Sequence, residues 1–295
     1  KDAGAWRAKL TDKPSSPKKR TGLVSAAQIG LPEDRTYTDY VEMAKREARL
    51  KDGIEAVSIV VPNHMHLPVA REFLKRGIHV ICDKPLTGTL SDARKMQAAA
   101  ENSEALFILT HNYTGYPLVR EAQARIAAGE LGDLRLVQVE YAQDWLAEEP
   151  EPDNKQASWR TDPARSGAGG ATGDIGTHAW NLMRFVTGLV PESLAADLQS
   201  FVPGRELDDN AHVMLRFKEK NGVRPKGMLW ASQVAPGFEN GLKIRVCGTK
   251  GGIDTDAAGR ALRRLHRRPF KNPPRSRLNH LWVANRPLTC HRELK

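Results

Sequence analysis

The sequence contains only three cysteines among its 295 residues, and Cys82, Cys247 and Cys290 lie far apart. This number and spacing exclude a disulfide framework and the paired ligand motifs of a structural zinc site. No apolar run approaches the roughly 20 residues that span a bilayer, and residues 1–20 lack the apolar core of a signal peptide. We therefore expect a cytoplasmic protein without membrane association.

Most of the chain also lacks net charge. The formal net charge is +10, yet residues 1–258 are electrically balanced, and the excess lies in residues 259–295, which hold eleven Lys/Arg side chains and one acid. That segment has no recognisable nucleic-acid-binding motif and no regular basic face, so nucleic-acid binding is the less favoured interpretation. We expect residues 254–295 to be a basic Arg/Pro-rich tail and residues 1–20, rich in Pro, Ser and Lys, to be a disordered leader.

Short β-branched runs alternate with helical patterns between residues 54 and 112. The order strand, helix, strand, helix, strand with short links is typical of a doubly wound parallel sheet. Ligands bind such sheets beyond the carboxyl ends of the strands. Polar residues follow all three predicted strands: Pro62-Asn63-His64 after 56–61, Asp83-Lys84-Pro85 after 78–82, and His111-Asn112-Tyr113 after 106–110.

The pattern changes after residue 134 to alternating apolar and polar residues. Segments near 134–141, 212–217, 228–231 and 242–246 predict strands of a mostly antiparallel sheet, with one helix over 174–186. We therefore expect a partial dinucleotide-binding, Rossmann-like domain over residues 21–120 and a substrate-binding and oligomerisation α+β domain over 121–253.

Gly173-Asp174-Ile175-Gly176-Thr177-His178 is the segment with the clearest chemistry. A helix that begins here places Asp174 and His178 on one face, a turn apart. A carboxylate that orients an imidazole, with Lys84 from elsewhere in the chain, suits removal of a proton from an alcohol while a hydride leaves its carbon. The alternatives are an acid favoured by the helix dipole for Asp174 and a solvated lysine at a strand end for Lys84.

Three short motifs occur in order: Val61-Pro62-Asn63-His64-Met65-His66, Cys82-Asp83-Lys84-Pro85 and Gly173–His178. They are similar to the T-P-N-x-x-H, E-K-P and D-x-G-x-H motifs of the Gfo/Idh/MocA family of NAD(P)-dependent oxidoreductases, over about residues 30–253. The resemblance implies a Rossmann-like parallel sheet followed by an α+β domain with an open, mostly antiparallel sheet. It also implies a homodimer or homotetramer that transfers a hydride between a sugar, cyclitol or related polyol and NAD or NADP.

The resemblance assigns roles to individual residues. Lys84, Asp174 and His178 would move the proton, and the cofactor would be bound by Val61, Pro62, Asn63, His66, Asp83, Lys84 and Asn112. The alternative for Pro62 and Asn63 is a turn that merely stops a strand. His64 and His66 have no acidic partner at a suitable spacing, so we expect no metal site.

A loop with mixed aromatic and hydrogen-bonding side chains follows the first strand of the second domain. Such a lining suits a polyhydroxylated ring, although an ordinary exposed loop is an equal alternative. The candidate substrate-binding residues are Asp144, Trp145, Lys155, Gln156, Trp159 and Arg160, with Asn181 further along the following helix.

Two departures from the family pattern stand out. The G-x-G-x-x-G turn that binds the cofactor pyrophosphate is missing, so we expect the first βαβ unit to be missing or replaced by residues 1–29. Asp83 also stands where glutamate is usual. Patternless, basic ends suggest the hypothesis of a fragment or of ends read out of frame. The missing turn also favours an alternative function, an inactive family remnant that binds the cofactor weakly or not at all.

Overall fold

The computed structural model describes residues 30–151, 153–256 and 262–266. The expected leader and residues 1–29, where the first βαβ unit is expected to be missing or replaced, lie outside the described residues, as does most of the expected basic tail. The chain divides into two units, Lys1–Leu265 and His266–Lys295. The elements below belong to the first of these units, apart from the last residue of the final strand.

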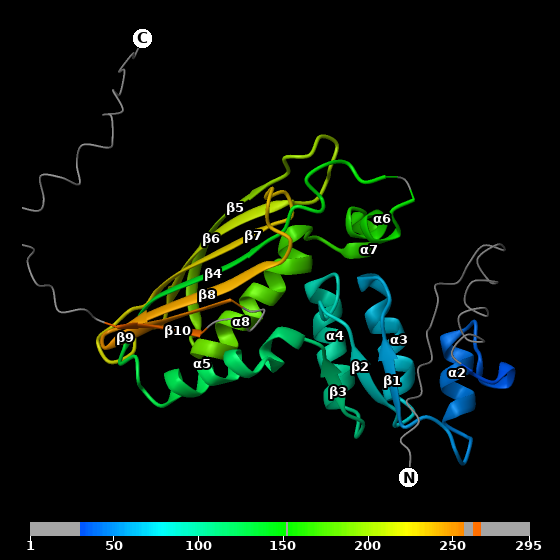
Figure 1. Ribbon diagram of the computed structural model, residues 1–295. Coiled ribbons are helices and arrows are strands. Elements are labelled where there is room, and N and C mark those ends of the chain that lie inside the picture. The colour runs from blue at the N-terminus through cyan, green and yellow to red at the C-terminus, as the bar shows by residue number, and fades with distance from the viewer. Residues whose placement is uncertain (1–29, 152, 257–261, 267–295) are drawn as a thin grey trace, which may run out of the picture. The chain divides into compact units, whose positions relative to one another are not determined.

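A three-stranded parallel sheet forms the first part of the fold (Figure 1). Its order is β1-β2-β3, with Val57 opposite Val80 and Ile81 opposite Ile108. This arrangement confirms the predicted Rossmann-like parallel sheet. Its strands are β1 (Ala56–Ile59), β2 (His79–Cys82) and β3 (Phe107–Leu109), and its helices are η1 (Glu33–Arg35), α2 (Tyr40–Glu47), η2 (Asn63–Met65), α3 (His66–Leu74) and α4 (Leu90–Glu101).

Apolar burial and polar caps explain these elements. Alternate strand residues such as Val57 and Val80 are buried against the helix side chains Phe73 and Met96. Helix α4 is capped by Thr89, because the Thr89 hydroxyl accepts a hydrogen bond from the backbone N–H of Asp92.

A seven-stranded sheet of order β10-β9-β8-β4-β7-β6-β5 forms the second part. β4 and β7 are parallel, whereas β5–β6, β6–β7, β4–β8 and β8–β9 are antiparallel, which confirms the predicted mostly antiparallel sheet. The sequence pattern missed β5, because nearly all its side chains are exposed. It also missed β9 and β10, of which β10 lies within the expected basic tail. The strands are β4 (Leu134–Ala142), β5 (Pro191–Gln199), β6 (Asn210–Phe217), β7 (Lys226–Ser232), β8 (Gly241–Gly248), β9 (Gly251–Asp256) and β10 (Leu262–His266).

Helix α8 (Thr177–Thr187) packs on β4, β7 and β8, and α5 (Pro117–Ala127) packs beside it (Figure 1). Between helices and strands lies a core that includes Leu182, Val139 and Phe217. The remaining short elements are η3 (Asn112–Gly115), α6 (Lys155–Arg160), α7 (Pro163–Ser166) and η4 (Thr172–Gly176).

The helix expected to begin at Asp174 begins instead as the π-helical turn η4, and α8 follows it. A distant carboxylate binds the residues at the start of this turn. Asp208 accepts hydrogen bonds from the backbone N–H groups of Gly170 and Thr172 and from the Thr172 hydroxyl, at 2.7–2.8 Å. These bonds hold in place the residues at the start of the π-helical turn. Single π-helical turns inside helices are frequent at functional sites.

No helix within the described ranges combines the length and the apolar character needed to cross a bilayer.

The burial of Phe217 predicts that its substitution lowers the stability of the fold far more than substitution of the neighbouring Lys218. Phe217 is fully buried and fills the space left by Gly227, where a Cβ atom would lie 2.8 Å from the Phe217 ring. We expect Phe217→Ala to lower the free energy of unfolding by about 3–5 kcal/mol, through lost apolar burial and a cavity. Urea denaturation measures this, and exposed Lys218 supplies the control, since Lys218→Ala should change stability by less than about 0.5 kcal/mol. Equal losses in the two variants would contradict the described core.

Candidate active site

An ion pair joins residues that are ninety positions apart in the sequence. Lys84 Nζ, in the turn after β2, donates to Asp174 Oδ1 at 2.6 Å and to the backbone oxygen of Asp174 at 2.7 Å. The two side chains are only 15% and 14% exposed, so water screens their attraction weakly. The Lys84–Pro85 peptide bond beside the pair is cis. The fold thus brings two of the three predicted catalytic residues into direct contact.

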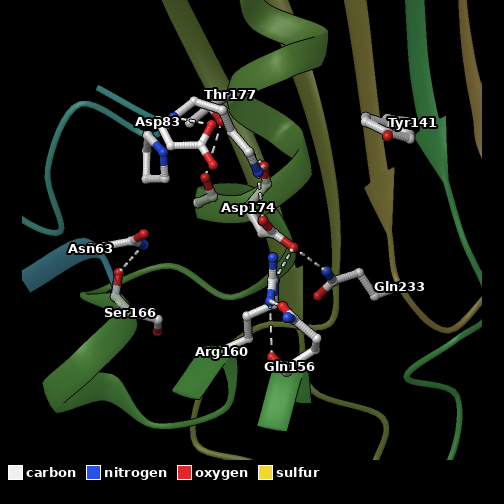
Figure 2. A network of polar contacts seen from close by, with 12 residues as sticks. Asn63, Asp83, Tyr141, Gln156, Arg160, Ser166, Asp174, Thr177 and Gln233 are labelled. Atoms are coloured by element: carbon white, nitrogen blue, oxygen red, sulfur yellow. Dashed lines mark hydrogen bonds and ion pairs between the residues drawn. The ribbon is translucent and has the colours of Figure 1, made fainter. Parts of the chain in front are cut away.

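The second carboxylate oxygen of Asp174 has two further donors (Figure 2). Arg160 Nε donates to Asp174 Oδ2 at 3.1 Å, and Gln233 Nε2 donates to the same atom at 2.9 Å. We call Lys84, Arg160, Asp174 and Gln233 the Asp174 cluster. Burial by itself raises the pKa of the Asp174 carboxyl, but the charges of Lys84 and Arg160 outweigh it and hold that pKa below its usual value. Asp174 is therefore an anion at neutral pH.

His178 lies in the first turn of α8, buried among aromatic rings. Its ring centroid is 4.8 Å from that of Tyr113, 5.6 Å from that of His111 and 6.0 Å from that of Tyr141. The expected contact in which Asp174 orients this imidazole is not formed between the two described residues. Both oxygens of Asp174 are already bonded to the other members of the Asp174 cluster.

The same surroundings keep His178 neutral. Burial lowers the pKa of His178, and the positive charges of Lys84 and His111 lower it further, to about 3, while Asp174 opposes the shift. An imidazole with so low a pKa is uncharged at physiological pH, so a ring nitrogen is free of the proton. That nitrogen can accept a hydrogen bond from a bound hydroxyl group.

Two acceptor oxygens at the carboxyl ends of the strands have no protein partner in the described part of the chain. Asp83 Oδ1 accepts hydrogen bonds from the Thr110 hydroxyl at 2.7 Å and the Lys84 N–H at 3.1 Å, which leaves Oδ2 without one. Asn63 Nδ2 donates to the backbone oxygen of Ser166 at 2.8 Å, and Asn63 Oδ1 is buried without a partner. Unpartnered acceptors at this edge fit hydroxyl and amide donors of a bound molecule.

The structure gives His66 a different environment from the one expected. The side chain is fully buried, with Nδ1 2.8 Å from the Pro85 oxygen and Nε2 3.0 Å from the Val61 oxygen. Burial lowers its pKa, although the two carbonyls oppose this. His66 therefore lies between the backbone oxygens of the two strand-end loops and has no exposed surface for a ligand. Asn112, by contrast, is exposed.

Part of the predicted substrate-binding set surrounds Arg160. Its Nη1 donates to the backbone oxygen of Gln156 at 2.9 Å and to Oε1 of the same residue at 2.8 Å. The guanidinium carbon lies 4.2 Å from the ring centroid of Trp159 and 5.7 Å from that of Trp145.

Three other predicted substrate residues are not joined to the Asp174 cluster by hydrogen bonds within the described ranges. Asp144 accepts from the Gly237 N–H at 3.1 Å. Lys155 is exposed, and Asn181 is half-buried.

The loops that carry these residues touch at two glycines. Gly167 has a φ of +96°, and a Cβ atom there would lie 2.1 Å from the backbone oxygen of Gly88. A Cβ atom built on Gly88 would in turn lie 3.2 Å from the α-carbon of Gly167. Only glycine permits this approach of the two backbones. The approach holds the loop after β2, which includes Lys84, against the loop before η4.

Two family descriptions match the chain. Residues 9–111 match "Oxidoreductase family, NAD-binding Rossmann fold", and residues 119–254 match "GFO/IDH/MocA C-terminal domain". The chain belongs to the Gfo/Idh/MocA oxidoreductase family. This confirms the predicted family and fold.

Several Gfo/Idh/MocA proteins are similar to this chain. An oxidoreductase from Sinorhizobium meliloti has 55% identity and a TM-score of 0.72, covering 85% of this chain and 68% of that one. An inositol dehydrogenase homolog from Azotobacter vinelandii, complexed with NAD⁺, has 31% identity and a TM-score of 0.80, covering 90% and 70%. Levoglucosan dehydrogenase from Pseudarthrobacter phenanthrenivorans is 31% identical, covering 68% and 55%. The chain spans 55–57% of the length of the curated relatives it matches first.

Sequence reasoning missed two residues of this Gfo/Idh/MocA site. Gln233 follows β7 and is 3% exposed, and its only sequence signal is its place at the end of an apolar strand. His111 follows β3, and its ring meets that of His178. Its position in a polar segment at a strand end was visible in the sequence.

The low pKa of His178 predicts how stability depends on pH. The unfolded chain protonates this histidine near pH 6.5, but the folded chain does so only near pH 3. Its contribution to stability is therefore complete above pH 6.5 and is lost as the pH falls toward 3, by about 1.4 kcal/mol per pH unit. We expect His178→Phe, which cannot be protonated, to show a shallower fall of the free energy of unfolding between pH 6.5 and 4. Urea titrations at several pH values measure the slope, and an unchanged slope would contradict the neutral imidazole.

Proposed function

We propose that this chain is an NAD(P)-dependent dehydrogenase that acts on a CH–OH group of a sugar, cyclitol or related polyol. The Asp174 cluster carries the proposal together with His178, because a lysine ammonium and a neutral histidine lie near one another beside the ligand-binding edge of a Rossmann-like sheet. Family membership supports it, as do the relatives named for inositol and levoglucosan.

The residues at the strand ends fit the nicotinamide half of the cofactor. Asp83 Oδ2 and Asn63 Oδ1 are acceptors without partners among the described residues, suited to ribose hydroxyls and to the carboxamide N–H group. Val61 and Pro62 add an apolar surface, and exposed Asn112 adds an amide. When bound, the cofactor supplies the hydride acceptor.

The proton is handled by Lys84 and His178. The Lys84 ammonium donates a hydrogen bond to the substrate oxygen and stabilises the negative charge that develops there as the hydride leaves. Asp174 balances the lysine charge and fixes its direction through two hydrogen bonds. Neutral His178 accepts the hydroxyl proton. His66 acts indirectly, since it holds the loops of Val61 and Pro85 in place.

Cofactor binding tests the proposal first. We expect the full chain to quench or enhance NADH or NADPH fluorescence with a dissociation constant in the micromolar range, and to reduce NAD⁺ or NADP⁺ with a polyol from a panel that includes myo-inositol and levoglucosan, as in the complexes of similar structures. The fluorescence titration and the absorbance of NADH at 340 nm measure the two. Absence of both signals would support the inactive remnant instead.

A substitution of Lys84 tests its proposed role at the substrate oxygen. We expect Lys84→Met to lower kcat at least about a hundredfold, because the substrate oxygen loses its cation and Asp174 loses its partner. Steady-state kinetics with the best polyol measure the change. Lys95→Met, on the exposed side of α4, is the matched control and should leave kcat unchanged. A near-normal kcat in the Lys84 variant would refute the assignment.

We also propose that two or more copies associate through the uncovered face of the seven-stranded sheet, in the cytoplasm. Helices α5 and α8 cover one face, while Met214, Met228 and Leu136 on the opposite face are 65%, 50% and 54% exposed. The same face holds the Lys243–Glu140 ion pair. A face with apolar residues and both charge signs can pair with its own copy about a two-fold axis.

The free thiols of Cys82 and Cys247 suit a reducing compartment.

A charge reversal on this face tests the association. We expect the Met214→Glu/Met228→Glu double variant to be monomeric where the unmodified chain is a dimer or tetramer, because four carboxylates would meet across the interface. Sedimentation at micromolar concentration measures the mass. Arg120→Glu, at an exposed position of α5, is the control and should leave the mass unchanged. A monomeric unmodified chain would contradict this part of the proposal.

A further inference from the structure

Arg160 is held by contacts that leave it little freedom. It is the last residue of α6, a helix capped by Asn154, whose side chain accepts hydrogen bonds from the N–H groups of Gln156 and Ala157. Nη1 is bonded twice to Gln156, and the guanidinium lies over the Trp159 ring. Nε donates a hydrogen bond to Asp174 Oδ2. A guanidinium fixed on three sides is suited to hold another group in place.

Gln233 approaches the same carboxylate from a second rigid element (Figure 2). Its backbone N–H donates to the Asp209 backbone oxygen at 2.8 Å, and its own backbone oxygen accepts from the Leu146 N–H at 3.2 Å. The side chain is 3% exposed and donates from Nε2 to Asp174 Oδ2. Arg160 and Gln233 thus reach one oxygen of Asp174 from different sides, on segments more than seventy residues apart.

Three side-chain hydrogen bonds, two to Oδ2 and one to Oδ1, fix the orientation of the Asp174 carboxylate. Rotation of the Asp174 carboxylate would break the bonds from Arg160 and Gln233 before it could move Oδ1 away from Lys84. The charge of Arg160 also helps to keep Asp174 ionised inside a buried site. The two residues therefore act on the lysine through the carboxylate.

We propose that Arg160 and Gln233 are positioning residues that orient the Asp174 carboxylate, so that Lys84 Nζ is held toward the reacting oxygen, and that Arg160 does not bind the substrate. This assignment rests on the proposed dehydrogenase function. It replaces the expectation from the sequence that Arg160 recognises a substrate hydroxyl.

The two roles for Arg160 predict different kinetics. A positioning residue affects the chemical step, so we expect Arg160→Met to lower kcat about a hundredfold and to change the KM for the polyol by less than about threefold. Arg160→Lys, which keeps the charge and is the second variant should the first fail to fold, should recover about tenfold of that loss. Arg120→Met, at an exposed position of α5, is the matched control. A rise of KM above about tenfold with kcat nearly unchanged would overturn the proposal.

A double-mutant cycle tests whether Arg160 acts through Asp174. In an Asp174→Asn background, where the carboxylate charge is gone, we expect Arg160→Met to lower kcat by less than about threefold further. Gln233→Leu should show the same dependence on Asp174, with a smaller loss in the unmodified background, since its hydrogen bond is neutral. Losses that multiply independently of Asp174 would overturn the proposal.

A titration without cofactor or turnover separates this proposal from the dehydrogenase assignment. The carboxyl ¹³C resonance of Asp174 is identified by its loss in Asp174→Asn. We expect Arg160→Met to raise the pKa of this carboxyl, because a stabilising cation is removed from a buried anion, and Arg120→Met to leave it unchanged. An inactive chain that shows the rise would refute the function and retain the Asp174 contact. An unchanged pKa would overturn the positioning role itself.

Discussion

The ion pair between Lys84 and Asp174 is the interaction on which the site depends. It ties the turn after a strand of the parallel sheet to the π-helical turn that precedes α8. The lysine alone would be one more cation at a strand end, and the aspartate alone an acid in a first turn. Together they form a partly buried pair whose direction is fixed, and His178 stands one turn further on with its proton-accepting nitrogen uncharged.

Such a pair needs support, because removing two charges from water costs more than their attraction returns unless further hydrogen bonds satisfy them. Arg160 and Gln233 provide these bonds on the carboxylate, and the Asp174 backbone oxygen provides one on the ammonium. Stability alone therefore does not explain the arrangement. It is the kind of site in which charges are held ready for a reaction.

A second set of contacts fixes the loops from outside the site. Asp208 anchors the entry to the π-helical turn, Asn63 bonds the loop at Ser166, and the backbones at Gly88 and Gly167 approach so closely that side chains are excluded. Each joins segments that are distant in the chain. The positions of the motif residues thus depend on contacts made by several residues that belong to no motif.

The local patterns of the sequence determined the strands of the first sheet to within about two residues, because β-branched runs bounded by polar turns are typical of buried strands. They also determined the motifs that indicate the family and the polar strand ends. Strand β5 escaped prediction because its exposed side chains follow no alternation. The tertiary structure alone decided that Asp174 turns to Lys84, Arg160 and Gln233 instead of His178, and that His66 is buried. Those outcomes depend on which donors meet in space, and the donors come from segments ninety, fourteen and fifty-nine residues away, a distance over which no periodic pattern carries information.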